Sequence, residues 1–186
     1  MRRLVVLALG SLGLLGACSD TRTPETTRDR QLAVAPPIQS ASIYGNELSV
    51  KLVDGVKLGD VVDMSVFGQF EPDVPITEVQ AKHGKPESER TDHRGRFYTY
   101  NSPKAKVEIA HEQSSSGVGD ATWTKWAVYA YPAETTASKL FHEALLKQLA
   151  TVRPGQLLVM TKGRERLLAK LQGDKIEELR WFRVSQ

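Results

Sequence analysis

The residues of this chain that could do chemistry are one cysteine, Cys18, and four histidines, His83, His93, His111 and His142. Zinc sites place cysteines and histidines at characteristic short spacings, as in the H-E-x-x-H motif, and no pair here has such a spacing. A lone cysteine also excludes a disulfide bond within the chain. The serine- and glycine-rich stretch at residues 114–120 lacks the G-x-S-x-G pattern of a nucleophile elbow. We therefore expect no catalytic site, no metal and no cofactor.

Cys18 follows a segment that is typical of an export signal. Arg2 and Arg3 form a positive start, and Leu4–Ala17 is an uncharged, apolar run. This run is too short for a bilayer span of about 20 residues, but it fits the core of a signal peptide. We therefore expect residues 1–17 to be a signal peptide that is absent from the mature protein.

The residues around Cys18 resemble the lipobox of bacterial lipoproteins, since Leu15, Gly16 and Ala17 directly precede the cysteine. The resemblance implies signal recognition at these three residues, lipidation (palmitate included) at Cys18, and cleavage just before it. Several acyl chains together anchor a protein firmly to a membrane. In that family an aspartate directly after the cysteine retains the protein in the inner membrane. By the same resemblance, Ser19 at this position implies the outer membrane, periplasmic face, with the inner membrane as the alternative. An ordinary secretory signal with an incidental cysteine is the competing interpretation.

The mature chain is nearly neutral and has a tether-like start. Without Arg2 and Arg3, 23 basic residues face 22 acidic ones, so the charge does not indicate nucleic-acid binding. Residues 18–43 are rich in threonine, serine, proline and charge, which predicts a flexible tether. Residues 44–186 are then expected to form the folded periplasmic domain, with 44–131 and 132–186 as candidate subunits.

Apolar periodicity and turn residues predict an α+β fold, with an antiparallel β-sheet packed by one or two helices. A capping box at Thr77 and Gln80, followed by Gly84 and Pro86, predicts a helix over 77–84. An apolar stripe predicts a second helix between Thr136 and Pro154, and Asp54-Gly55 predicts a hairpin turn. The expected strands are 88–92, 96–101, 104–112, 122–131, 156–161, 166–172 and 175–184. A helix thus precedes a β-meander twice, at 77–131 and 136–184, which suggests a duplicated unit.

The stretch ITEVQAKHGKP (76–86) and the aromatic strand FYTY (97–100) resemble the SmpA/OmlA (BamE-like) lipoprotein domain. Members of that family are small outer-membrane lipoproteins, with helices packed on an antiparallel sheet, that support the assembly of outer-membrane β-barrels. The resemblance covers the 76–112 region. It implies this fold more than a function; a scaffold role in outer-membrane assembly or a secretion apparatus is a hypothesis beside it.

Aromatic residues concentrate in the predicted strands, where core packing explains most of them. Rings on the outer face of the sheet would instead anchor a partner protein. The candidate partner-binding residues are Tyr98, Tyr100, Trp123, Trp126, Tyr129 and Trp181. The leading hypothesis is a non-enzymatic, lipid-anchored envelope protein that binds another envelope protein. The alternatives are a periplasmic inhibitor or immunity lipoprotein that acts against a lytic enzyme or toxin, and an envelope hydrolase. The sequence leaves the partner and the oligomeric state open.

Overall fold

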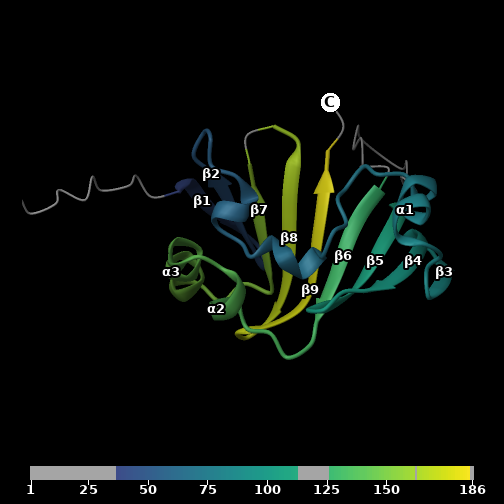
Figure 1. Cartoon of the computed structure of the whole chain (residues 1–186). Helices are drawn as coiled ribbons and strands as arrows, with labels where there is room; N and C mark the ends of the chain where they lie inside the picture. The colour runs from purple at the N-terminus through teal and green to yellow at the C-terminus, as the bar shows by residue number, and fades with distance from the viewer. Residues whose placement is uncertain (1–36, 113–125, 162, 185–186) are drawn as a thin grey trace, which may run out of the picture. The chain divides into compact units, whose positions relative to one another are not determined.

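Nine strands form one sheet in the computed structural model, which describes residues 37–112, 126–161 and 163–184. Along the sheet the strands follow the order β1-β2-β7-β8-β9-β6-β5-β4-β3 (Figure 1). The bounds of the strands are β1 Ile38–Tyr44, β2 Glu47–Leu52, β3 Ser88–Asp92, β4 Gly95–Asn101, β5 Ala105–Glu112, β6 Trp126–Pro132, β7 Gln156–Met160, β8 Glu165–Gln172 and β9 Lys175–Arg183. All of them belong to one compact unit, residues 35–186.

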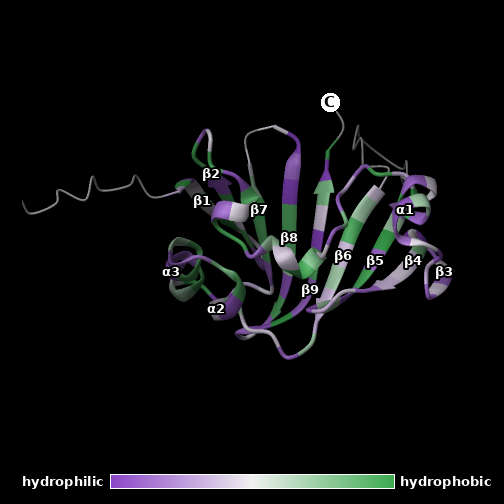
Figure 2. Ribbon diagram, in the orientation of Figure 1, coloured by the Kyte–Doolittle hydropathy of each residue, from purple (hydrophilic) through white to green (hydrophobic). Residues whose placement is uncertain are grey.

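The helices are short and all pack on one face of the sheet, which we call the helix-covered face. They are the 3₁₀ helices η1 (Leu58–Asp60) and η2 (Met64–Phe67) and the α-helices α1 (Ile76–His83), α2 (Ala137–Leu140) and α3 (Glu143–Thr151). The main core lies between them and the strands. Its fully buried members include Leu48, Phe67, Val107, Ile109, Leu145, Leu157, Leu167 and Leu179. Figure 2 shows hydrophobic and hydrophilic bands alternating along β8 and β9, as expected for strands with one buried face.

One strand pair is parallel and joins segments that are far apart in sequence. β2 pairs with β7 in parallel, and every other neighbouring pair is antiparallel. At the start of this pair the Gly155 N–H donates to the Asn46 side-chain oxygen (2.7 Å) and lies 3.0 Å from the Asn46 carbonyl oxygen. A side chain at Gly155 would collide with the Asn46 amide. Gly155 therefore allows the β1–β2 hairpin to approach β7 closely.

The predicted α+β class was wrong, because the described residues are mainly β, with 48% in strands and 21% in helices. The two candidate subunits, 44–131 and 132–186, are not separate, since β2 of the first pairs with β7 of the second. Two helix-plus-meander segments do occur along the chain, but they share one sheet and one core. The predicted tether also extended too far, because its last residues, 38–43, form most of β1. β1 is an almost fully exposed edge strand, so it has no apolar alternation that could be recognised.

The predicted long helix is divided into α2 and α3. Phe141 is extended and forms an antiparallel bridge with Val62, and the His142 N–H donates to the Val61 carbonyl. His142 Nδ1 then accepts from the Ala144 N–H and caps α3. A contact with a distant segment therefore overrides the helical pattern at this point.

Two further local predictions were wrong in part. After the turn at Asp54-Gly55 the chain does not form the second strand of a hairpin. It enters η1 instead, where Leu58 is buried. Helix α1 begins at Ile76 with Pro75 as its N-cap, and no side-chain cap is made there, so Thr77 does not cap it. Gly84 does end the helix, with a φ of 82° that suits glycine.

Candidate functional site: an arginine–aromatic patch

The opposite face of the sheet is not covered by any helix of the described residues, and we call it the helix-free face. It has a small core of its own, formed by Phe97, Ala110, Ala127, Tyr129 and Phe182. The strand register brings these residues together. Phe97 pairs with Ala110, and Ala110 pairs with Ala127 across β4, β5 and β6. The ring centroids of Phe97 and Tyr129 are 5.6 Å apart, a distance typical of a favourable aromatic pair.

Arginine side chains cover these rings. The Arg90 guanidinium lies 3.7 Å from the Phe97 centroid, and that of Arg94 lies 5.2 Å from it. The Arg180 guanidinium lies 4.5 Å from the Phe182 centroid. Cations at these distances over ring faces are attracted by the ring quadrupole. The helix-free face therefore carries stacked arginines where the other face carries helices.

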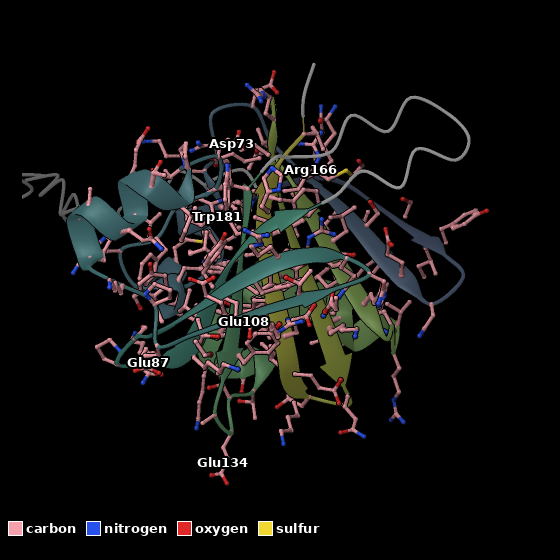
Figure 3. All side chains as sticks on the ribbon, turned by 90° about the vertical axis from the view of Figure 1, so that its right-hand side faces the viewer. Asp73, Glu87, Glu108, Glu134, Arg166 and Trp181 are labelled. Atoms are coloured by element: carbon pink, nitrogen blue, oxygen red, sulfur yellow. The ribbon has the colours of Figure 1, made fainter. Side chains whose placement is uncertain are left out.

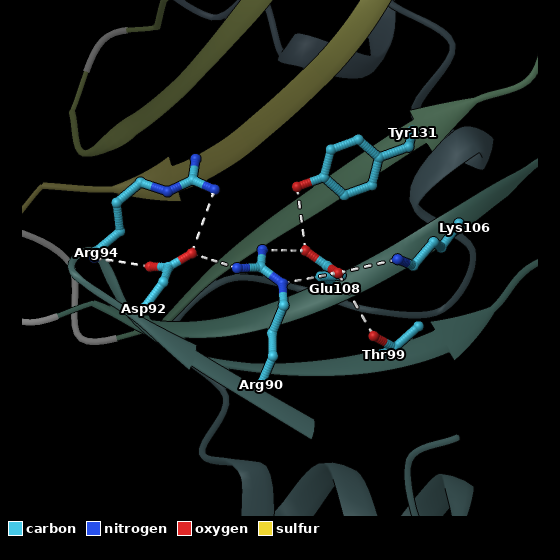
Figure 4. A network of polar contacts seen from close by, with 7 residues as sticks. All are labelled: Arg90, Asp92, Arg94, Thr99, Lys106, Glu108 and Tyr131. Carbon is cyan, nitrogen blue, oxygen red and sulfur yellow. Dashed lines mark hydrogen bonds and ion pairs between the residues drawn. The ribbon is translucent and has the colours of Figure 1, made fainter. Parts of the chain in front are cut away.

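Glu108 on β5 is a buried carboxylate that accepts hydrogen bonds from the surrounding side chains of this face (Figure 4). Only 2% of its side chain is exposed. Its Oε2 accepts from Arg90 Nη2 at 2.8 Å and from the Tyr131 hydroxyl at 3.1 Å. Its Oε1 accepts from Arg90 Nε at 3.4 Å and lies 3.2 Å from Lys106 Nζ. Thr99 Oγ1 adds a longer contact of 3.5 Å, so the carboxylate has a partner on both oxygens. Figure 3 shows Glu108 within the sheet, whereas Glu87 and Glu134 project from its periphery.

Asp92, at the end of β3, fixes the outer side of the network. It forms ion pairs with Arg90 and Arg94, and its Oδ1 accepts from the Arg94 N–H at 2.8 Å. Arg90 thus bridges a buried carboxylate and a partly exposed one, and Arg94 is held in place at the β3–β4 turn. We define the arginine–aromatic patch as Arg90, Asp92, Arg94, Phe97, Lys106, Glu108, Tyr129, Tyr131, Arg180 and Phe182.

The pKa shifts in this network stabilise the ordinary charge states. Burial raises the pKa of Glu108, but the hydrogen bonds and charges of Arg90 and Lys106 outweigh it, so the net shift is downward. Burial first, and the Glu108 charge second, raise the pKa of Tyr131. The hydrogen bond to Glu108 raises the pKa of Arg90. A general acid or base needs a pKa near the working pH, and these shifts lead away from it. The geometry therefore suits charge presentation rather than proton transfer.

The residues predicted to bind a partner lie in several places. Tyr98 and Tyr100 are buried on the helix-covered face, and Tyr129 is buried within the patch. Trp181 is partly buried and lies against Phe67, with ring centroids 5.5 Å apart. Most of these rings therefore leave little surface for a partner.

Trp126 is the exception among the predicted residues, because its partly exposed ring lies beside a pocket. Its ring centroid lies 4.7 Å from that of the exposed His111. Both line a shallow pocket of about 280 Å³ together with Thr91, Arg96 and Tyr98. Trp123, and the signal and lipidation residues Leu15, Gly16, Ala17 and Cys18, lie outside the described residues.

A second concave feature is an apolar groove of about 570 Å³ between α3 and the β8–β9 hairpin. Leu146, Leu149 and Leu171 line it, and Arg153 and Asp174 are among its lining residues. It brings no group of three histidine, cysteine or acidic side chains together, and none is found elsewhere in the described part of the chain.

The sequence did not point to Arg90 or Glu108. Glu108 alternates with Val107 and Ile109, a pattern that by itself indicates a solvated position on the outer face of a strand. Its burial depends on Arg90 and Tyr131, which lie 18 and 23 positions away. The local signal for this site was limited to β6, where Tyr129 and Tyr131 stand at alternate positions on the helix-free face.

Comparisons with protein-family models, curated proteins and solved structures gave no match to the chain. The resemblance to the SmpA/OmlA domain therefore stays a prediction. Within the described residues, no helix has the length and apolar character needed to cross a bilayer.

Proposed function

We propose that this chain is a non-enzymatic, lipid-anchored protein of the cell envelope that binds another envelope protein through its arginine–aromatic patch. The observation that carries the proposal is the set of partly exposed guanidinium groups held over aromatic rings on the helix-free face. Arginine and aromatic residues dominate the binding energy of protein interfaces. Because ion pairs and ring contacts already restrict Arg90 and Arg94, less conformational entropy is lost on binding.

Charge indicates the kind of partner surface. The patch has four cations, Arg90, Arg94, Lys106 and Arg180, and two carboxylates, Asp92 and Glu108. Arg94 and Lys106 have exposed side-chain fractions of 41% and 53%. A partner with an acidic surface would therefore be attracted and oriented by this face.

A matched pair of charge reversals tests which surface binds. Arg94→Glu changes the patch, whereas Arg96→Glu changes an exposed arginine two residues later, beside the Trp126 pocket. Partners are captured by crosslinking in intact cells and identified by mass spectrometry. We expect Arg94→Glu to abolish capture and Arg96→Glu to retain it. The reverse result would assign binding to the pocket that contains Trp126 and would overturn the patch proposal.

The identity of the captured partner separates the scaffold role from its rival. Recovery of barrel-assembly or secretion components supports the scaffold. Recovery of only a toxin or a lytic enzyme supports an inhibitor or immunity role instead. A hydrolytic activity that is lost on alanine substitution of the histidines would overturn both.

The membrane anchor is proposed on the sequence around Cys18 alone. A Cys18→Ser variant should move from the membrane fraction to the soluble fraction and lose incorporation of labelled fatty acid. A matched Ser19→Ala variant should keep both. Retention of Cys18→Ser in the membrane fraction would contradict the lipid anchor.

A further inference from the structure

The two edges of the sheet differ in how they are protected against further strand pairing. β3, at one edge, is five residues long and carries Glu89, Arg90 and Asp92. β1, at the other edge, is seven residues long and reads IQSASIY, without a charged side chain or a proline. No described strand pairs with its outer side. Natural proteins usually block exposed edges with charges, proline, β-bulges or short strands. β1 has a register shift between Ile38 and Ser40, but residues 40–44 keep a regular register and carry no charge or proline.

The exposed apolar side chains of the described residues are found at the same edge. Ile43 and Tyr44 are the two large hydrophobic residues in the exposed class, with 57% and 86% of their surface accessible. They point to opposite faces, since Ile43 pairs with Leu48 of the main core and Tyr44 pairs with Glu47. A strand added alongside β1 would contact both residues, whereas a body docked on one face would contact only one.

The register of the β1–β2 hairpin shows which backbone groups are available. Tyr44 and Glu47 flank a two-residue turn, so they exchange hydrogen bonds with each other. Residues of an antiparallel pair alternate between bonding to the partner strand and facing away from it. Ser42 therefore bonds towards β2, and the N–H and C=O groups of Ala41 and Ile43 face outward.

We propose that β1 pairs with β1 of a second copy of this chain, antiparallel, about a two-fold axis at Ser42. In this register Ala41 exchanges both hydrogen bonds with Ile43 of the second copy, and Ile43 does so with its Ala41. Ser42 lies opposite Ser42 of the second copy.

The same register also covers the exposed side chains. Tyr44 lies across from Ser40 of the second copy, and Ile43 lies across from its Ala41. Each large side chain thus meets a small one on the same face, so the strand is complementary to itself. This self-complementarity is what favours a second copy over an unrelated strand. The pairing is independent of the proposed partner binding, since β1 and the patch occupy different parts of the sheet.

Disulfide trapping in the full-length, membrane-associated protein tests this register. In this register Ser42 and Ser42 of the second copy form a non-hydrogen-bonded antiparallel pair. The Cα atoms of such a pair are about 4.5 Å apart, within the range that a disulfide can bridge. Ser42→Cys should therefore give a reducible dimer of twice the monomer mass after mild oxidation. Ser40→Cys is the matched control, because Ser40 of the two copies would be about 13 Å apart along the strands. The unsubstituted chain controls for any thiol at Cys18.

Three results would overturn the proposal. The first is a Ser42→Cys protein that stays monomeric under oxidation, and the second is equal dimer formation by Ser40→Cys. The third is a crosslinked product whose mass fits a different protein, which would assign the edge to a heterologous strand. As a further check, adding Ile43→Lys to the Ser42→Cys protein should reduce the dimer to a minor band, because a lysine at the edge opposes strand pairing.

Discussion

On one face of the sheet, three α-helices and two 3₁₀ helices cover the strands. On the other, arginine side chains lie over aromatic rings and a carboxylate. The helix-covered face buries leucine, valine and phenylalanine with little polar content. The helix-free face buries Glu108 as fully as those apolar residues, but only by surrounding it with hydrogen-bond donors. The first arrangement suits stability, because apolar burial is its main driving force. The second keeps charge at the surface and suits recognition.

A matched pair of phenylalanine truncations should show the largest difference between the two faces. Phe67, the last residue of the covering helix η2, and Phe97, under the arginines, are both completely buried. Phe67→Ala should lower the free energy of unfolding by about 3–5 kcal/mol, because the packed core cannot close the cavity. Phe97→Ala should cost about 2 kcal/mol, because the Arg90 and Arg94 side chains lose their ring contact and can shift inward to fill part of the space. Denaturant unfolding measures both, and equal losses would break the comparison.

Removal of Arg90 should test whether the helix-free face depends on charge compensation. Arg90→Ala should cost about 2 kcal/mol, because it leaves the Glu108 carboxylate buried with fewer donors. This is below the usual range for buried pairs, since Arg90 is 39% exposed and Lys106 remains. The double variant Arg90→Met, Glu108→Leu should recover most of the loss in the same unfolding assay. If the double variant is as unstable as Arg90→Ala, the buried charge is not the cause.

Lowering the pH should lower the free energy of unfolding through protonation of Glu108 on the helix-free face. The pKa of Glu108 is lowered in the folded state, so the folded protein binds fewer protons than the unfolded chain. Its contribution is therefore fully present above the unfolded value of 4.5 and is lost as the pH falls through the lower folded pKa. Glu108→Gln should be less stable at neutral pH and should lose stability less steeply below pH 4.5.

The measurement for this prediction is unfolding at a series of pH values. Some acid sensitivity will remain in Glu108→Gln, because the pKa values of Asp63 and Asp92 are also lowered. Parallel pH curves for the two proteins would show that Glu108 does not contribute.

The smallest effect is expected at a charged pair on the solvent side of the covering helices. Lys147 and Glu143 form an i,i+4 ion pair at 2.7 Å, but both side chains are more than 70% exposed. Lys147→Ala should therefore change the free energy of unfolding by about 0.5 kcal/mol or less. A loss as large as that of Arg90→Ala would show that exposure does not distinguish the two ion pairs.

Local patterns predicted those elements whose ends depend on local chemistry. The strand 88–92 was predicted with its observed bounds, and β4, β5, β8 and β9 were predicted to within a residue or so. Gly84 ends α1 as expected, because a left-handed residue is needed there. These features need only turn residues and alternation, which a single sequence provides.

The larger missed features depend on contacts between distant segments. The parallel β2–β7 pair leaves no periodic signal, and the Val62–Phe141 bridge interrupts a regular helical stripe. The site was missed for the same reason. A glutamate in an alternating strand looks solvated until Arg90, Tyr131 and Lys106 are brought around it.

The parallel β2–β7 pair also affects the order in which the strands join the sheet during folding. Asn46 and Gly155 are 109 positions apart, so the β1–β2 hairpin can form early but must wait for β7 before it joins the sheet. Contacts between such distant positions form slowly. Until then both edges of the hairpin lack partners. In the monomer we expect the hairpin amides to exchange with deuterium faster than those of β5 and β6, which would mark the hairpin as the segment where unfolding begins.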